Sequence, residues 1–167
     1  MSLLGFPNPV NEKAARVVAF GVLLLVIATI LLGVLAGPRW LWLTAVLAAG
    51  FVARVLTGPR LSPLGQLATR VVAPRLGAPK LVAGPPKRFA QGMGATMTIA
   101  AVAFQAFGVH VAVYALLGLM VVAAGLESLL AICLGCIVFG WLMRAGVIPD
   151  EVCAECADIS LRTPSAA

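Results

Sequence analysis

The four cysteines of the chain lie in its last quarter, as two pairs with the same spacing, Cys133-Leu134-Gly135-Cys136 and Cys153-Ala154-Glu155-Cys156. Two residues three positions apart share one face of a helix, so each pair can form a reactive disulfide. The first thiol is the better nucleophile where a helix begins at it, because the helix N-terminus lowers the thiol pKa. Burial in mid-helix would instead raise that pKa and leave the thiol inert. The spacing therefore indicates redox or sulfur-transfer chemistry, with Cys133, Cys136, Cys153 and Cys156 as candidate catalytic residues.

The residues leave two other interpretations of these cysteines open. Sixteen residues separate Cys136 from Cys153, a spacing found in zinc ribbons, and four thiolates suit Zn²⁺ or an iron–sulfur centre. Alternatively, the thiols are small buried apolar groups without chemistry, in a non-catalytic subunit of a membrane assembly. No other cofactor or nucleotide fingerprint is visible in the chain. In a cytoplasmic location we do not expect permanent disulfides, because structural disulfides are rare there.

The composition indicates that these cysteines belong to a membrane protein. Of the 167 residues, 62% are hydrophobic and only 11% are charged, and the mean hydropathy is +1.07. A soluble domain has about a quarter of its residues charged. The stretch 17–36 contains no charged residue and is long enough to cross about 30 Å of hydrocarbon. The sequence therefore predicts an all-α integral membrane protein.

Four apolar segments can cross the bilayer, and short turns join them in pairs. They are residues 17–36, 40–57, 89–107 and about 111–130. Short connections make consecutive segments antiparallel neighbours, so we expect a four-crossing antiparallel helix bundle. Asn11 is a candidate cap for a helix that leads into the first crossing.

The connection 58–88 contains six basic residues and no acidic residue. This bias places the connection, and with it both termini, on the cytoplasmic side of the membrane. Apolar residues at helical spacing over 64–72 predict a short interfacial helix on an anionic leaflet, with a solvated basic loop as the alternative. The basic residues behind the net charge of +6 lie between membrane segments, without interleaved aromatic residues. We therefore expect no nucleic-acid partner.

The fourth apolar segment, from Val111 to Arg144, is too long for one straight crossing. We expect an over-long or bent helix, with its bend or break at Gly125 or Gly135 and the first cysteine pair at the cytoplasmic interface. The chain then divides into a transmembrane helical domain, residues 1–146, and a cytoplasmic acidic tail, residues 147–167. The second cysteine pair belongs to this tail.

Two charged residues lie within the apolar segments. Glu127 is the only acidic one, and Arg54 lies at nearly the same depth in the second segment. Because charges within a membrane need a partner, we expect a structural ion pair between Arg54 and Glu127. The alternative is that each side chain extends separately to the interface. Glu127 is also a candidate for proton transfer to the cysteine pair, provided that the helix breaks between Glu127 and Cys136.

Several short motifs resemble those of a known family. They are Asn8-Pro9-Val10-Asn11, Pro86-Lys87-Arg88-Phe89-Ala90-Gln91-Gly92-Met93-Gly94, Leu126-Glu127-Ser128 and Cys133-Leu134-Gly135-Cys136. Together they resemble the bacterial membrane family called domain of unknown function 4395, over roughly residues 6–142. The Pro-Lys-Arg-Phe-Ala and Cys-Leu-Gly-Cys blocks are its most specific elements.

The resemblance implies a small multi-pass domain of the bacterial cytoplasmic (inner) membrane, in which the first Cys-x-x-Cys pair is a family feature. It implies no established activity. Members of the family accompany thioredoxin-like and sulfur-handling proteins, which favours thiol–disulfide or sulfur-transfer chemistry with a soluble thioredoxin-like or sulfurtransferase partner. Cys153 and Cys156 lie beyond the matching part, so the resemblance implies nothing about them.

Overall fold

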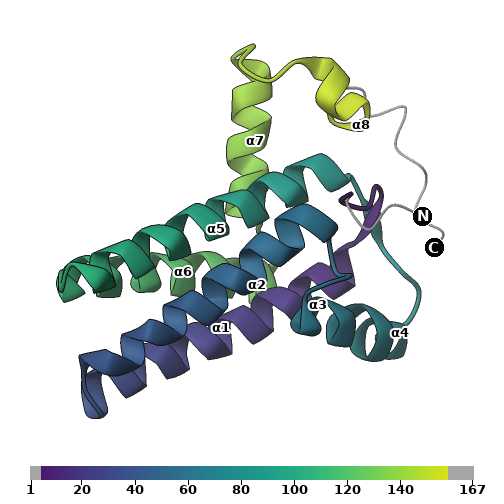
Figure 1. Cartoon of the computed structure of the whole chain (residues 1–167). Helices are drawn as coiled ribbons and strands as arrows, with labels where there is room; N and C mark the ends of the chain where they lie inside the picture. The colour runs from purple at the N-terminus through teal and green to yellow at the C-terminus, as the bar shows by residue number, and fades with distance from the viewer. Residues whose placement is uncertain (1–4, 158–167) are drawn as a thin grey trace.

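The computed structural model of the protein describes residues 5–157. Four long helices form an antiparallel bundle, and one shorter helix projects from its side, next to α5 (Figure 1). The long helices are α1 (Glu12–Leu35), α2 (Leu43–Thr57), α5 (Gly84–Ala106) and α6 (His110–Leu130). The shorter helix is α7 (Leu134–Arg144). A 3₁₀ helix, η1 (Pro38–Trp42), connects α1 to α2.

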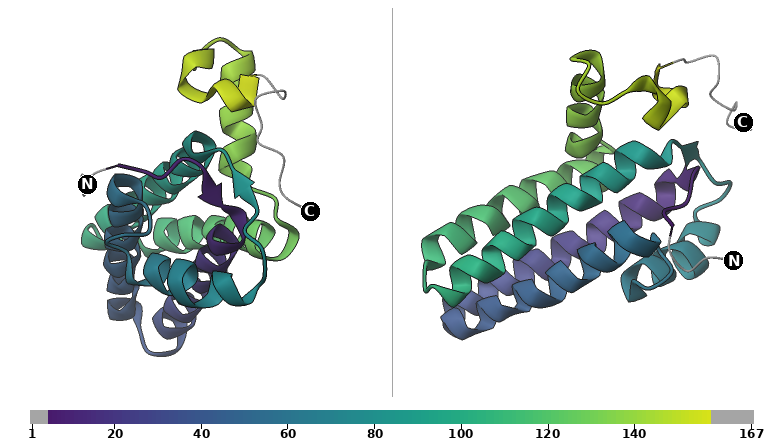
Figure 2. Two further views of the ribbon diagram at one scale, coloured as in Figure 1. Left: turned by 90° about the vertical axis from the view of Figure 1, so that its right-hand side faces the viewer. Right: turned by 45° about the horizontal axis from the view of Figure 1, so that its top comes forward.

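The four long helices enclose one apolar core. Helix α1 packs on α2 and α6, and α5 packs on the same two helices, so that α2 and α6 lie diagonally across the bundle (Figure 2). Val26, Phe51, Ala101 and Leu117, one from each helix, are buried between them. At the end far from α7, the Gln105 side chain donates a hydrogen bond to the Pro38 carbonyl at 2.9 Å. This bond joins the end of α5 to the connection between α1 and α2.

Within residues 5–157, three helical stretches are long and apolar enough to cross a membrane, namely Glu12–Leu35, Pro38–Thr57 and His110–Leu130. Helix α5 is also long, but its Gly, Thr and Gln residues make it less apolar, and it is not among the three. The predicted helical membrane protein is therefore confirmed in part, while a fourth crossing formed by α5 stays a prediction.

Asn11 caps α1 as expected, since its side chain accepts a hydrogen bond from the Lys13 amide at 3.0 Å.

The connection between α2 and α5 contains a helical segment longer than the predicted 64–72. It comprises α3 (Pro63–Leu67), a π-helical turn η2 (Ala68–Val72) and α4 (Ala73–Arg75). Two short strands, β1 (Val10–Asn11) and β2 (Leu81–Val82), then pair antiparallel, a small departure from the expected all-α fold. This pairing holds the chain before α1 beside the chain before α5.

The fourth apolar segment forms two separate helices. Ala131, with a positive φ of 58°, ends α6, and Cys133 is extended immediately before α7. The predicted break points, Gly125 and Gly135, need correction because both lie inside helices. Gly135 has another role: a Cβ there would lie 2.5 Å from the Ala90 Cβ, so its lack of a side chain lets α7 approach α5.

The chain after α7 returns toward the start of α5 (Figure 1). It forms a 3₁₀ turn, η3 (Asp150–Cys153), and a single helical turn, α8 (Ala154–Ala157). The second cysteine pair lies on these two turns. The rest of the predicted acidic tail, from Asp158 onward, lies outside the described residues, and the proposed division at residue 146 stays a prediction.

Candidate functional site

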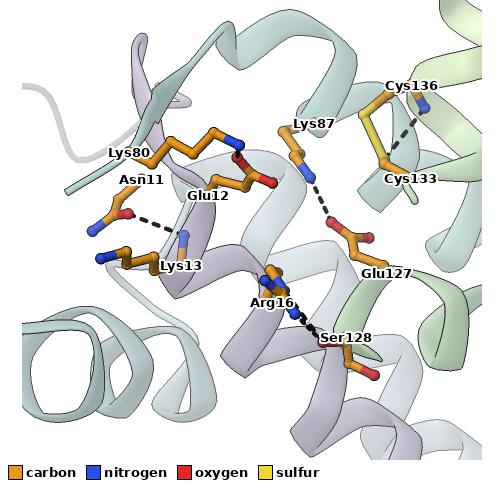
Figure 3. A network of polar contacts seen from close by, with 10 residues as sticks. All are labelled: Asn11, Glu12, Lys13, Arg16, Lys80, Lys87, Glu127, Ser128, Cys133 and Cys136. Atoms are coloured by element: carbon orange, nitrogen blue, oxygen red, sulfur yellow. Dashed lines mark hydrogen bonds and ion pairs between the residues drawn. A yellow bond between two sulfur atoms is a disulfide. The ribbon is translucent and has the colours of Figure 1, made fainter. Parts of the chain in front are cut away.

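Cys133 caps the N-terminus of α7. Its Sγ accepts a hydrogen bond from the Cys136 backbone amide at 3.3 Å (Figure 3). The two Cα atoms lie 5.2 Å apart, and the two sulfurs lie at disulfide distance. The sequence set one condition for a reactive first thiol, namely that a helix begins there, and α7 meets it. Helix-terminal amides that point at a sulfur favour the thiolate over the thiol.

The second pair has the same local geometry. The Cα atoms of Cys153 and Cys156 are 5.2 Å apart, and their sulfurs also lie at disulfide distance. Cys153 is buried, whereas Cys156 is half-buried. Each pair can therefore close a disulfide by itself, although the sequence did not lead us to expect permanent disulfides in the cytoplasm.

Both pairs border one open cavity of about 1180 Å³ between α7, the start of α5 and the chain after α7. Cys133, Cys136 and Cys156 all line it. The remaining wall combines charged and apolar side chains, chiefly Glu12, Lys80, Lys87, Arg144, Asp150, Ile132, Ile137, Phe139 and Met143. The fold therefore brings thiols from both motifs to the same hollow, which their separation in the sequence did not establish.

Glu127 pairs with a residue other than the one predicted. Its Oε1 lies 2.6 Å from Nζ of Lys87, and both side chains are largely buried (Figure 3). The predicted ion pair with Arg54 is wrong because α2 and α6 lie diagonally across the bundle, so equal depth does not bring the two side chains together. Lys87, assigned from the sequence to the loop, belongs to the first turn of α5. Within this new pair, Lys87 is the member that lines the cavity.

Arg54 instead lies in a polar cluster between α2, α3 and α5. Its Nε donates to Gln91 Oε1 at 2.8 Å, and its Nη1 donates to the Ser62 hydroxyl at 3.2 Å. The guanidinium also lies over the Phe51 ring, 4.5 Å from its centroid. These contacts satisfy a buried cation without a carboxylate, and so Arg54 has a structural role away from the cysteines.

Arg16 is a residue near the site that the sequence did not single out. From α1, its guanidinium donates to the carbonyl of Ser128, at 3.2 and 3.0 Å (Figure 3). It also donates to the carbonyl of Leu129, at 3.2 Å. These carbonyls belong to the last turn of α6, where helix carbonyls lack intrahelical partners. Arg16 thus fixes the end of α6 just before the extended residues that lead to Cys133. A basic residue immediately before the first apolar run was its only signal in the sequence.

The two cysteine pairs do not merge into a metal centre in the described conformation. Among residues 5–157, no group of three or more cysteine, histidine, aspartate or glutamate side chains is placed to hold a metal ion. Zinc or iron–sulfur binding by all four thiols would need the chain after α7 to move. The geometry instead suits two separate dithiols that share a cavity.

Comparison with known proteins gives one family. The family model described as domain of unknown function (DUF4395) matches residues 10–144, from β1 to the end of α7. No curated protein and no solved structure matches the chain. The match includes Lys87, Glu127 and the first cysteine pair, and it ends before Cys153. The chain thus belongs to the family of the domain of unknown function DUF4395.

Proposed function

We propose that the protein is a membrane component of thiol–disulfide or sulfur-transfer chemistry. Cys133 and Cys136 form the pair next to the membrane, and Cys153 and Cys156 form a second pair that exchanges with a soluble thioredoxin-like or sulfurtransferase partner. The observation that supports this most strongly is the position of Cys133 at the start of α7, with Cys136 and Cys156 lining the same cavity.

The exchange needs no cofactor and balances within the two pairs. A thiolate of the reduced pair attacks a sulfur of the oxidised pair, breaks that disulfide and forms a mixed disulfide. The second thiol of the attacking pair loses its proton and breaks the mixed disulfide. Two electrons and two protons thereby pass from one pair to the other. A soluble partner restores the second pair by the same two steps, as a dithiol where the second pair has been oxidised and as a disulfide where it has been reduced.

The setting of this chemistry is the cytoplasmic face of a bacterial inner membrane. We infer four crossings, in which α5 accompanies the three apolar spans, because α5 packs lengthwise between α2 and α6. The acid-free basic connection between α2 and α5 lies at the same end of the bundle as the cysteines, and basic loops remain in the cytoplasm. Both termini then lie in the cytoplasm, where a soluble partner can reach Cys156.

A cysteine-trapping experiment tests the exchange. The full-length protein, reconstituted in lipid nanodiscs, is prepared as Cys136→Ser/Cys153→Ser, which retains Cys133 and Cys156. Mild oxidation with diamide is expected to join these two thiols, as detected by mass spectrometry of proteolytic peptides. The matched control, Cys136→Ser/Cys156→Ser, retains Cys153, which is buried and does not line the cavity. Its cross-link should form more slowly.

Thiol counting and metal analysis of the unmodified protein separate the remaining functions. The exchange predicts no bound metal and a reversible loss of two thiols per oxidised pair. Stoichiometric zinc or iron with four protected thiols would overturn it in favour of the metal-binding function. Absence of both metal and cross-link would instead favour a non-catalytic subunit of a membrane assembly.

A further inference from the structure

The helical segment 63–75, here called the loop helix, is fixed against α1 by a face of small residues. Ala68 and Ala73 are buried on this face. The contact is close, since a Cβ added to Gly21 of α1 would lie 2.5 Å from Cδ1 of Leu64. The loop helix is therefore a docked part of the bundle, and its opposite face has a fixed orientation.

The outer face of the loop helix alternates large apolar and cationic side chains. Leu67 is 51% exposed and Val71 is 40% exposed. Arg70 and Arg75 are exposed beside them, and neither forms an ion pair within residues 5–157. On a surface that faces only water, Leu67 and Val71 would gain no free energy from burial of their apolar side chains. The combination is typical of a surface at the boundary between lipid headgroups and acyl chains.

The contacts between the loop helix and α1 show how far this outer face lies from the charge-free part of α1. Leu64 lies at Gly21, while Nζ of Lys13 donates to the carbonyl of Leu76 at 2.8 Å, so the loop helix runs antiparallel to the start of α1. The charge-free part of α1 begins at Val17. Leu67, one turn from Leu64, therefore lies level with the beginning of the apolar stretch. Residues farther along the loop helix lie closer to the aqueous side.

We propose that the outer face of the loop helix is a binding site for anionic phospholipids. Arg70 and Arg75 bind headgroup phosphates, and Leu67 and Val71 lie among the upper acyl chains. The acid-free character of the whole connection provides complementary charge to such a leaflet. This site is distinct from the thiol cavity, and it does not depend on any reaction of the cysteines. It also differs from a helix that lies flat on the membrane, because the loop helix follows α1.

Lipid-specific fluorescence quenching tests the site. Leu67→Trp is introduced into a full-length variant in which Trp40, Trp42 and Trp141 are replaced by phenylalanine. The protein is reconstituted in nanodiscs of phosphatidylcholine with one quarter phosphatidylglycerol, and either lipid is brominated on its acyl chains. Per mole of brominated lipid, phosphatidylglycerol is expected to quench the fluorescence of the introduced tryptophan about twofold more strongly than phosphatidylcholine does. The excess should fall with added salt, since salt screens exposed charges.

Charge variants distinguish a site from general membrane contact. Arg70→Gln/Arg75→Gln should abolish the preference for phosphatidylglycerol, whereas the matched control Arg39→Gln, at the other end of the bundle, should preserve it. Equal quenching by both lipids, no quenching by either, or a preference that survives the double substitution would overturn the proposal. If Leu67→Trp impairs folding, Val71→Trp reports on the same face. The cysteine pairs remain unchanged throughout, so a failure here is independent of the thiol exchange.

Discussion

The Lys87 ammonium lies 2.6 Å from the Glu127 carboxylate and joins the first turn of α5 to the last turn of α6. Only 11% of the Lys87 side chain and 15% of the Glu127 side chain are exposed. Removing one member of a buried pair leaves the other charge without compensation, which is the costly change. The pair therefore holds two helices together immediately before the chain leaves α6 for Cys133.

Lys87→Met should lower the free energy of unfolding by about 3 kcal/mol, because it leaves the Glu127 carboxylate buried and unpaired. Adding Glu127→Leu should recover most of this loss, since well-packed apolar side chains replace buried ion pairs at little cost. Equilibrium unfolding in mixed detergent micelles measures both variants. The control is Lys80→Met, whose ion pair with Glu12 has a lysine side chain that is 60% exposed.

The control substitution should cost less than about 1 kcal/mol, as is typical of exposed ion pairs. A double variant as unstable as the sum of its single substitutions would contradict the interpretation of Lys87 and Glu127 as one coupled unit.

Arg16→Gln should loosen the end of α6 and the chain that leads to Cys133. The substitution removes three hydrogen bonds from a guanidinium to the carbonyls of Ser128 and Leu129, with an expected loss of about 1–3 kcal/mol. Hydrogen–deuterium exchange should accelerate in peptides that cover residues 126–137. Lys13→Gln is the matched control, because Lys13 lies one turn earlier in α1 and bonds to Leu76 instead. Equal exchange in the two variants would refute the assignment of Arg16.

The elements that depend on local sequence were predictable. Long apolar runs gave α1, η1 with α2, and α6, within about five residues, because hydropathy alone identifies segments that suit lipid. Asn11 was recognisable as a cap because its side-chain oxygen can replace a missing helical partner. The start of α5 was placed too late in the chain, since Pro85 and Pro86 suggested a loop. Proline is in fact well tolerated in the first turn of a helix.

The features that depend on tertiary packing were not predictable from one sequence. Depth along a segment suggested Arg54 as the partner of Glu127, but only the order of helices around the bundle shows that α2 and α6 are diagonal. The break at Ala131 has no glycine or proline to mark it. The cavity shared by Cys136 and Cys156 likewise depends on the return of the chain after α7, which no local pattern determines.

Reduced Cys133 should react as a thiolate at lower pH than reduced Cys156. The Cys136 amide donates to the Cys133 sulfur at the start of an eleven-residue helix, whereas Cys156 lies on a single helical turn. The rate of alkylation by iodoacetamide, followed by mass spectrometry from pH 5.5 to 9, gives the midpoint for each thiol. This midpoint is insensitive to differences in exposure, which scale the rate at every pH. Both thiols in the detergent-unfolded protein provide the control, with midpoints of about 8.5. Coincident midpoints in the folded protein would remove the proposed activation of Cys133.

Gly135→Ala should displace α7 from α5 and disturb the cavity that the thiols line. An added Cβ would lie 2.5 Å from the Ala90 Cβ and 2.6 Å from its Cα, so part of the conflict is with backbone that cannot rotate away. We expect a destabilisation of about 1–3 kcal/mol, the usual cost of overpacking.

Gly140→Ala is the matched control on the same helix, because nothing lies within 4 Å of its added Cβ. It should be neutral or stabilise α7 by up to about 1 kcal/mol, since alanine favours a helix over glycine. Unfolding measurements on both variants, together with the Cys133–Cys156 cross-linking yield, separate a packing effect from a helix-propensity effect. If Gly135→Ala left both measurements unchanged, the close approach of α7 to α5 would not be what positions the first cysteine pair.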